Sequence, residues 1–362
     1  IKLTISGFNM NIYILIWFFI VAINFISNYK TYINKIFFLL FFLFLFIFIG
    51  LRFKVGGDWD NYLILYENFK YLNFKEALFF FEPGYSLLNI LGNFLQIKDI
   101  WFVNLCSSAL VCFFLFITFI RLKKYWLCLL IYYPYHILAV SLGYTRQSIA
   151  VAILLYAFLK LIQNDRNKFL FFLLLAACFH KTAIIFILFY PLLFIKRKKI
   201  LIFLYEFFSL VLITIVLYIS SLSENTVYTS EELNSSGVFL RLSLHIIPVI
   251  SYFLLRNKVF KIDKSYLILD YFVLLIFYCV GLSFIFSTLA DRFNLYLIFF
   301  DLYVVCMLYH NLKLVNRKIF IFILTIFLTS FIYIWMLNSV LVSKAWLPYQ
   351  NYLIDYLLNY VF

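Results

Sequence analysis

The chain has 362 residues, of which 66% are hydrophobic and only 13% are charged. Soluble domains have about one-quarter charged residues, so this composition excludes a water-soluble globular protein. The formal charge of +14 is high enough for a nucleic-acid-binding protein, but its distribution along the chain excludes that class.

Six short strips between apolar runs hold 19 of the 30 basic residues and only two of the 16 acidic residues. The strips carry a net charge of +17, and the rest of the chain carries −3. This asymmetry follows the positive-inside rule, so we expect the strips in the cytoplasm and no nucleic-acid partner. Their basic residues are Lys30 and Lys35; Arg121, Lys123 and Lys124; Lys160, Arg166 and Lys168; Lys196, Arg197, Lys198 and Lys199; Arg256, Lys258, Lys261 and Lys264; and Lys313, Arg317 and Lys318.

The apolar runs predict an all-α integral membrane protein. They are continuous rather than alternating, and hydrocarbon offers no hydrogen-bond partner to a free peptide group, so each run is expected to be a helix. With the basic strips inside, the chain makes about 12 crossings and both ends lie outside. Single crossings are expected at 10–28, 35–51, 101–120, 125–141, 143–162, 200–219, 239–255, 266–286, 292–309 and 319–337.

Two apolar stretches do not fit a single crossing. Stretch 84–97 is short and would break the parity, so we expect it to dip into the membrane from outside or to lie in the interface. Run 169–195 begins and ends at inside strips, which requires an even number of crossings. The polar residues His180-Lys181-Thr182 interrupt it, so we predict a broken or re-entrant helix near 179–183 that lines a cavity or protein interior.

We expect one polytopic domain over residues 1–362. Its predicted outer loops are 52–100, 220–238, 287–291 and 338–350. No cleavable signal peptide is expected, because the first apolar run lacks a small-residue cleavage site. The six cysteines lie inside apolar runs without ligand spacing, so we expect neither disulfides nor a zinc site.

The first predicted outer segment combines two glycines with an arginine, a lysine and two carboxylates. It reads Gly50-Leu51-Arg52-Phe53-Lys54-Val55-Gly56-Gly57-Asp58-Trp59-Asp60-Asn61-Tyr62. The glycines permit a tight turn, and the charged groups suit an anion and a sugar bound together. The alternative is a solvated loop leaving a helix. Glu82, in Glu82-Pro83-Gly84-Tyr85, is either a sugar contact or a plain helix-start signal.

Two further candidates lie near helix ends. Arg146 opens an otherwise uncharged span in Gly143-Tyr144-Thr145-Arg146-Gln147. It either snorkels outward or faces a wet cavity, and the cost of burial favours a functional role. His180 combines a ring that titrates near neutral pH with the predicted helix break. Its alternative role is structural, as a cap on a half-helix.

Arg241 and the pair Asp291-Arg292 open two later spans, with Asp291 as the expected counter-ion of Arg292. Together with Arg52 and Arg146, these arginines come from four segments at the same outer boundary. Guanidinium groups gathered in this way suit a pyrophosphate head group.

The motifs, taken together, resemble the EpsG-like, Wzy-type polysaccharide polymerases, and they occur in the family's order. They are Gly50-Leu51-Arg52, Gly57-Asp58-Trp59-Asp60-Asn61-Tyr62, Glu82-Pro83-Gly84-Tyr85-Ser86-Leu87-Leu88-Asn89, Arg146-Gln147, Phe179-His180-Lys181-Thr182-Ala183 and Leu347-Pro348-Tyr349. The family often has Gly-Thr-Asp-Tyr where this chain has Gly57-Asp58-Trp59. A GT-C-like bundle is one form that the fold could take.

The resemblance implies a membrane glycosyltransferase of the bacterial inner membrane, with its site facing the periplasm or cell exterior. Such a polymerase transfers a growing glycan from undecaprenyl pyrophosphate to the next lipid-linked repeat unit, making O-antigen, capsule or exopolysaccharide. A chain-length regulator is a further partner that the resemblance suggests. No nucleotide-binding motif is present, so we expect no soluble cofactor, and a divalent ion on Asp58 and Asp60 stays open.

This reaction gives each candidate residue a role. Arginines would stabilise the leaving pyrophosphate, and the acceptor hydroxyl needs a base, for which His180 and Asp58 are the candidates. We expect Arg146 to take part in catalysis. The expected substrate contacts are Arg52, Asp60, Tyr62, Glu82, Gln147, Arg241, Asp291 and Arg292.

Three other membrane proteins are alternatives. A flippase or transporter for lipid-linked sugars would favour symmetric halves with charges near the midplane, and no repeat is visible. A ligase of the O-antigen type would use the same arginine chemistry, so the sequence barely separates it from a polymerase. An acyltransferase would need an acyl donor from inside, which disfavours a site on the outer face.

Overall fold

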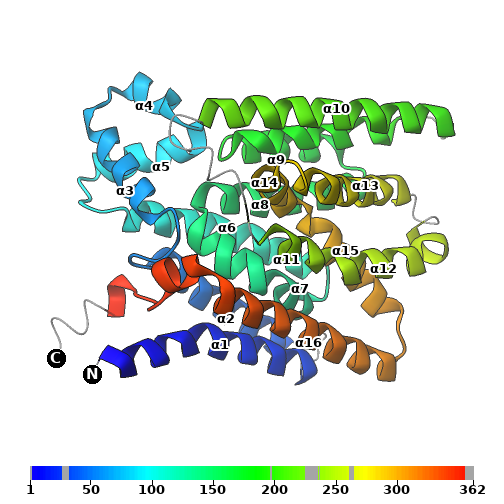
Figure 1. Cartoon of the computed structure of the whole chain (residues 1–362), viewed down its shortest axis with the longest axis horizontal. Helices are drawn as coiled ribbons and strands as arrows, with labels where there is room; N and C mark the ends of the chain where they lie inside the picture. The colour runs from blue at the N-terminus through cyan, green and yellow to red at the C-terminus, as the bar shows by residue number, and fades with distance from the viewer. Residues whose placement is uncertain are drawn as a thin grey trace. The chain divides into compact units, whose positions relative to one another are not determined.

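The computed structural model describes residues 2–26, 32–195, 198–224, 235, 237–260 and 265–354 (Figure 1). Within these residues the chain forms helices joined by turns, and the only β pairing is an isolated bridge between Arg52 and Asn351. Eight of the described helices are long and apolar enough to cross a membrane. The predicted all-α membrane fold is therefore confirmed.

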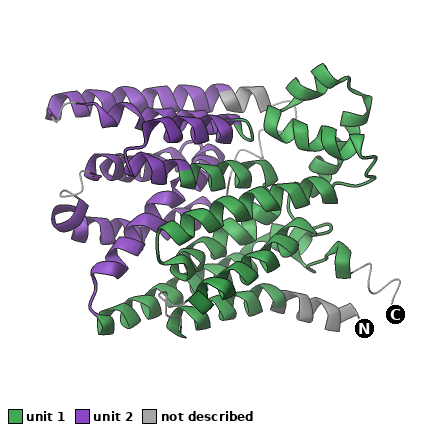
Figure 2. Cartoon of the chain, turned by 180° about the vertical axis from the view of Figure 1, so that it is seen from behind, with its two compact units in different colours: residues 1–156, 178–180, 314–362 green, residues 157–177, 181–313 purple. Residues whose placement is uncertain are grey.

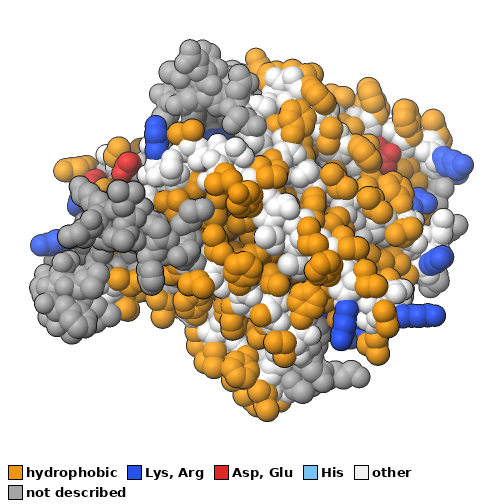
Figure 3. Space-filling model, turned by 60° about the horizontal axis from the view of Figure 1, so that its bottom comes forward, with side chains coloured by type: hydrophobic (Ala, Val, Ile, Leu, Met, Phe, Trp, Pro, Cys, Tyr) orange, Lys and Arg blue, Asp and Glu red, His pale blue; other side chains and the backbone are white. Residues whose placement is uncertain are grey.

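The helices follow the predicted spans closely. The eight long candidates are Tyr32–Gly50, Trp101–Arg121, Thr145–Ile162, Lys199–Ile219, Val238–Phe260, Tyr266–Ser283, Ser287–Asn311 and Leu314–Asn338. Shorter apolar helices cover Ile12–Ile26, Tyr125–Ser141 and Lys181–Leu193. Exposed apolar side chains cover much of the face seen in Figure 3, as expected of a surface that meets lipid.

The described chain divides into two compact units (Figure 2). Unit 1 comprises residues 1–156, 178–180 and 314–362, and unit 2 comprises 157–177 and 181–313. Helix α8 (Thr145–Ile162) runs through the boundary. The prediction of a single domain stays a prediction.

Unit 1 contains the first membrane helices and the last one. α2 packs against α6, and α1 packs against α7 and α16. Trp126 is buried in this core. Its ring centroid lies 4.9 Å from that of Phe38, and its Nε1 donates to Asn34 Oδ1 at 2.9 Å. The elements are α1 (Lys2–Ile26), α2 (Tyr32–Gly50), α3 (Trp59–Asn68), η1 (Phe69–Tyr71), α4 (Phe74–Phe80), α5 (Pro83–Phe94), α6 (Trp101–Arg121), α7 (Tyr125–Tyr132), η2 (Tyr133–Ser141), most of α8, α16 (Leu314–Asn338) and η9 (Val342–Trp346).

Unit 2 is built around closely packed aromatic rings. Phe272 lies at its centre, 4.5 Å from Phe189 and 5.9 Å from Phe299 between ring centroids. Such close packing is what holds helices together where no water drives association. The elements are α9 (Arg166–Ala177), η3 (Lys181–Phe189), η4 (Pro191–Leu193), α10 (Lys199–Glu224), α11 (Val238–Leu242), η6 (Ser243–His245), α12 (Ile246–Leu255), η7 (Arg256–Phe260), α13 (Tyr266–Ser283), α14 (Ser287–Asn294), η8 (Leu295–Leu297) and α15 (Ile298–Asn311).

The predicted break near 179–183 is confirmed. α9 ends at Ala177, and the 3₁₀ helix η3 begins at Lys181. α9 and η3 pack against each other, so the two halves form a short helical hairpin.

Two predicted outer loops differ from the structure. Segment 52–100 is largely helical, with α3, α4 and α5 grouped together in Figure 1. Residues 287–291 are not a loop but the first turns of α14, because the chain turns earlier, through Phe284 and Phe286. The loop was expected because these residues lie between two predicted spans, yet Asp291 is helical and pairs with Arg241. Most of the predicted loop 220–238 lies outside the described residues, and 338–350 includes η9.

Helix α5 has the reverse of the usual amphipathic arrangement. Its exposed side carries Leu87, Leu91 and Phe94, whereas Ser86 and Asn89 are buried. Its 12 residues extend about 18 Å, which is too short for a bilayer of about 30 Å. This geometry fits the predicted dipping or interfacial helix, whose membrane position stays a prediction.

Candidate functional site

Arg146 and Glu82 form an ion pair in unit 1. Arg146 Nη1 donates to Glu82 Oε2 at 2.8 Å, and the two side chains are 24% and 9% exposed. The guanidinium carbon lies 4.8 Å from the ring centre of Phe81. Arg146 Nε is buried and donates to no acceptor. The Glu82 carboxylate and the Phe81 ring thus fix the position of the guanidinium.

Glu82 is placed by the start of α5. It is the N-cap residue, with extended backbone, and Pro83 occupies the first turn, where its missing N–H costs nothing. Its carboxylate makes no capping hydrogen bond, which leaves it available to Arg146. Burial disfavours the ionised carboxylate, but the charges of Arg146 and His180 outweigh burial and lower the pKa of Glu82 below its ordinary value. Glu82 is therefore an anion at neutral pH.

Gly84 brings the α5 motif against the helix break. Its N–H donates to Cys178 O at 2.7 Å. A Cβ on residue 84 would lie 2.8 Å from that oxygen and 3.1 Å from the ring of Phe179. Only glycine allows this approach, which places the buried His180 within electrostatic range of Glu82.

Gly56 and Gly143 form a second close contact around Trp346. Gly56 has φ +113°, and a Cβ there would lie 2.1 Å from Leu142 O. A Cβ on Gly143 would lie 2.9 Å from the Trp346 ring. Gly56 N donates to Ala345 O at 2.8 Å, and Trp346 Nε1 donates to Leu138 O at 2.6 Å. The glycine-rich motif is thus locked against the start of α8.

The structure places Arg52 inside unit 1, where it is 2% exposed. Its guanidinium donates to Ile49 O, Val55 O, Asn104 Oδ1 and Thr145 Oγ1. Burial lowers the pKa of Arg52 to about 10, so the side chain is still charged at neutral pH.

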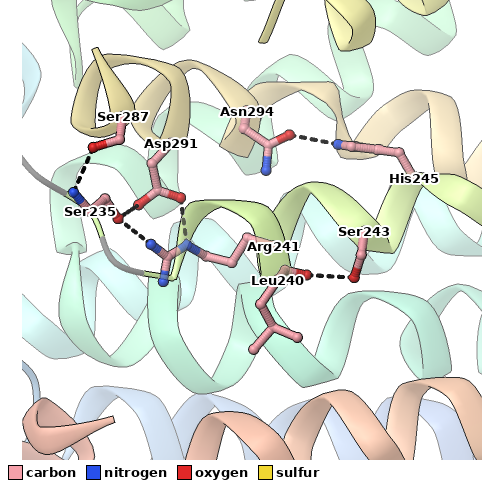
Figure 4. A network of polar contacts seen from close by, with 8 residues as sticks. All are labelled: Ser235, Leu240, Arg241, Ser243, His245, Ser287, Asp291 and Asn294. Carbon is pink, nitrogen blue, oxygen red and sulfur yellow. Dashed lines mark hydrogen bonds and ion pairs between the residues drawn. The ribbon is translucent and has the colours of Figure 1, made fainter. Parts of the chain in front are cut away.

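Arg241 and Asp291 form a second ion pair, in unit 2 (Figure 4). Arg241 Nε on α11 donates to Asp291 Oδ1 on α14 at 2.5 Å, and Ser235 Oγ donates to Asp291 Oδ2 at 3.2 Å. Gly237 makes room for this pair, since a Cβ there would lie 2.7 Å from Arg241 Nη1. The sequence suggested Arg292 as the counter-ion of Asp291, so the bond to Arg241 was not predicted.

A family model described as the EpsG family matches residues 35–351. The chain belongs to the EpsG family. The resemblance inferred from the motifs is therefore confirmed, and membership indicates a glycosyltransferase-like enzyme with a polysaccharide-polymerase type of function. No curated protein and no solved structure matches the chain. The GT-C-like arrangement stays a prediction.

Unit 1 of this EpsG family protein brings together eight of the candidate residues. Tyr62 is buried, with its ring centre 5.6 Å from that of Tyr85, and its hydroxyl accepts from Arg146 N at 3.4 Å. Asp58 is the N-cap residue of α3, Asp60 is exposed and Gln147 is buried. Arg52, Glu82, Arg146 and His180 complete the set. The five motifs that contain these residues thus belong to one unit.

Arg241, Asp291 and Arg292 of the EpsG family protein belong to unit 2. A single pocket lined by all four arginines therefore stays a prediction. Among the described residues, no three His, Cys, Asp or Glu side chains form a group that could hold a metal ion.

Sequence reasoning missed several supporting residues of the EpsG family protein. Thr145, Asn104 and Trp346 fix the site segments but carry no charge. In unit 2, His245 contacts Asp301 and Asn294, each at 2.7 Å, in a buried group that was not predicted. A polar residue inside an apolar run, such as Asn104, could have marked these positions as structurally important. The sequence does not show, however, which residue such a side chain contacts.

Proposed function

We propose that this protein polymerises oligosaccharide repeat units carried on undecaprenyl pyrophosphate. The growing glycan moves from its lipid carrier to a hydroxyl at the non-reducing end of the next lipid-linked unit. The observation that carries the proposal is the partly exposed Arg146–Glu82 pair, whose carboxylate is within electrostatic range of His180.

The proposed step forms one bond and breaks one. The acceptor oxygen attacks the anomeric carbon of the donor sugar, and the bond from that carbon to the diphosphate oxygen breaks. The electron pair leaves with the lipid diphosphate, and the hydroxyl proton passes to a base. Arg146 stabilises the charge that develops on the leaving diphosphate, because its guanidinium is preorganised by Glu82 and Phe81.

His180 is the proposed base. The ionised Glu82 carboxylate is within electrostatic range and would stabilise the positive charge that the imidazole gains when it takes the acceptor proton. Asp58, at the start of α3, is the alternative base. Asp60, Tyr62 and Gln147 are proposed sugar contacts.

Two further parts of the proposal concern place and partners. The basic strips support a multi-pass protein of the bacterial inner membrane whose motif segments open away from the cytoplasm. On unit 2, Arg241, Asp291 and Arg292 are proposed as additional contacts to sugar or phosphate. We propose no resident cofactor, and a chain-length regulator is a proposed partner.

Deletion of the gene, followed by gel analysis of surface glycan, tests the reaction class. A polymerase leaves one-repeat glycan in place of a ladder. Loss of all lipid-linked units outside the membrane would instead indicate a flippase, and full-length chains left unattached would indicate a ligase.

Substitutions test the site at normal protein level. Arg146→Ala and His180→Ala should abolish the ladder in the complemented deletion strain. Arg166→Ala is the matched control, because this arginine also lies over an aromatic ring, 4.2 Å from the centre of Phe194, but belongs to a predicted cytoplasmic strip. The ladder should survive in the control, and its survival in both site variants would refute the assignment.

A further inference from the structure

The conformation of the Arg52 side chain is fixed by hydrogen bonds to backbone carbonyls close to it in the sequence. Its Nη1 donates to Ile49 O at 2.8 Å, and its Nε donates to Val55 O at 3.2 Å. These carbonyls belong to the end of α2 and to the glycine-rich motif. The guanidinium is thereby fixed at the point where α2 ends.

The Nη2 group of Arg52 reaches two other elements. It donates to Asn104 Oδ1 on α6 at 3.1 Å and to Thr145 Oγ1 at 2.8 Å. Thr145 is the first residue of α8, and Arg146 follows it directly. A single peptide unit therefore separates the residue that Arg52 holds from the residue that faces Glu82.

Besides the hydrogen bond from Arg52 to Thr145, a second set of contacts fixes the first turn of α8. Arg146 N donates to Tyr62 Oη at 3.4 Å, so the hydroxyl of Tyr62 meets one of the N–H groups that a helix start leaves without a helical partner. Gly143, just before the helix, packs on Trp346. The direction in which Arg146 leaves the helix is therefore set by contacts to its immediate neighbours.

Arg52 is poorly placed to bind a substrate itself. A guanidinium has five N–H donors, and the four hydrogen bonds of Arg52 engage all three of its nitrogen atoms. The side chain is also 2% exposed. A diphosphate could reach it only by displacing protein acceptors.

We infer that Arg52 is a positioning residue that acts through Thr145 to orient Arg146, rather than a contact to the lipid diphosphate. This inference rests on the proposed function, in which Arg146 stabilises the leaving group. Asn104 assists by holding the same Nη2 atom from α6.

The inference predicts an effect on kcat rather than on KM. Arg146 acts on charge that appears only in the transition state, so misplacing it slows the chemical step with little change in ground-state binding. A displacement of about 1 Å in such a group costs up to about 100-fold in rate. Thr145→Val keeps the side-chain shape but removes the acceptor oxygen. We expect it to lower kcat about 10- to 100-fold and to leave KM within about threefold.

The measurement uses full-length protein in lipid nanodiscs, with lipid-linked repeat units extracted from the gene-deletion strain as substrate. Thr145→Ser retains the hydroxyl and should restore kcat to within about threefold of the wild type. Asn104 gives an independent pair of variants. Asn104→Asp keeps the acceptor and replaces the Nδ2 group, which has no partner, with a carboxylate oxygen beside the charged Arg52, whereas Asn104→Ala removes the acceptor. Only Asn104→Ala should lower kcat.

The decisive comparison combines Thr145→Val with Arg146→Lys. If Arg52 and Thr145 act through Arg146, the double variant should be little slower than Arg146→Lys alone. Rate losses that multiply in the double variant, or a wild-type kcat in both Thr145→Val and Asn104→Ala, would overturn the inference. A wild-type kcat for Arg146→Lys and Arg146→Ala would instead overturn the proposed function.

Discussion

Arg146 and Glu82 are 64 residues apart in the sequence, yet Nη1 of the arginine donates to Oε2 of the glutamate at 2.8 Å. The pair joins the start of α8 to the start of α5. Both residues come from helix starts, and residues close to them in the sequence set their positions. Thr145 accepts a hydrogen bond from Arg52, and Gly84 N–H donates to Cys178 O. The geometry of this pair is thus a property of four segments together.

Removing the charge of Glu82 should damage both stability and activity. Glu82→Gln keeps the shape but leaves Arg146 without its counter-charge, and we expect a loss of about 1–3 kcal/mol together with a strong reduction of the glycan ladder. Thermal unfolding in detergent and the glycan gel measure the two effects. Glu67→Gln is the control, because Glu67 pairs with Lys70 on an exposed surface, where such a pair contributes about 0–1 kcal/mol. Equal unfolding temperatures for the two variants would contradict the prediction.

The stability supplied by Glu82 should depend on pH in a defined direction. Burial opposes its ionisation, but Arg146 and His180 hold its pKa below the ordinary value of 4.5. A carboxylate with a lowered pKa in the folded state stabilises the fold above its unfolded pKa, and this stabilisation is lost as pH falls through the folded pKa. The wild type should therefore be more stable than Glu82→Gln at neutral pH, and this difference in stability should disappear as the pH falls below 4.5. Unfolding midpoints of both proteins, measured over a series of pH values, test this. If the wild type stays more stable at low pH, the ion pair is not the source of the difference.

A methyl group at Gly84 should separate α5 from the helix break. The new Cβ would lie 2.8 Å from Cys178 O, a backbone atom that cannot move without shifting Phe179 and His180. We expect Gly84→Ala to cost about 1–3 kcal/mol and to weaken or abolish the ladder. Gly281→Ala is the control, since a Cβ there meets nothing within 4 Å. The same loss of activity in both variants would show that the contact with Cys178 is not the cause.

The Arg241–Asp291 pair should behave as a unit. Asp291→Asn leaves a guanidinium that is 14% exposed without its counter-charge, so we expect a loss of about 1–3 kcal/mol. Arg241→Gln should cost a similar amount, and the double variant should cost less than the sum of the two. Unfolding temperatures of the three purified proteins measure the coupling. Strict additivity would mean that the two side chains do not interact.

The spans could be predicted from the sequence because the information is local. Continuous apolar runs and basic strips identified α2, α6 and α8, and the polar residues at His180 marked the end of α9 within three residues. The first turns of α14 were missed because residues 287–291 fell between two apolar runs, at the charged residue Asp291. Hydropathy does not reveal that Asp291 can stay helical when Arg241 supplies a counter-charge.

The residues of the candidate site and the contacts between them could be predicted only in part. Family motifs named Glu82, Arg146 and His180, but no local pattern connects Glu82 to Arg146 or Gly84 to Cys178. Arg52 shows the limit most clearly, because its role depends on acceptors from three separate segments. Charge alone suggested a ligand contact for this residue, whereas its hydrogen bonds favour an internal support.

The bridge between Arg52 and Asn351 has a consequence for biosynthesis. Tyr349 Oη donates to Phe48 O in α2 across 301 residues, so α2 and the Arg52 segment after it acquire these partners only when residues 349–351 have been translated. Until then the nascent chain carries an incomplete core that quality-control proteases can recognise. A premature stop codon after α16 should therefore shorten the lifetime of the truncated protein in the cell, even though the eight long apolar helices of the described residues have already been made.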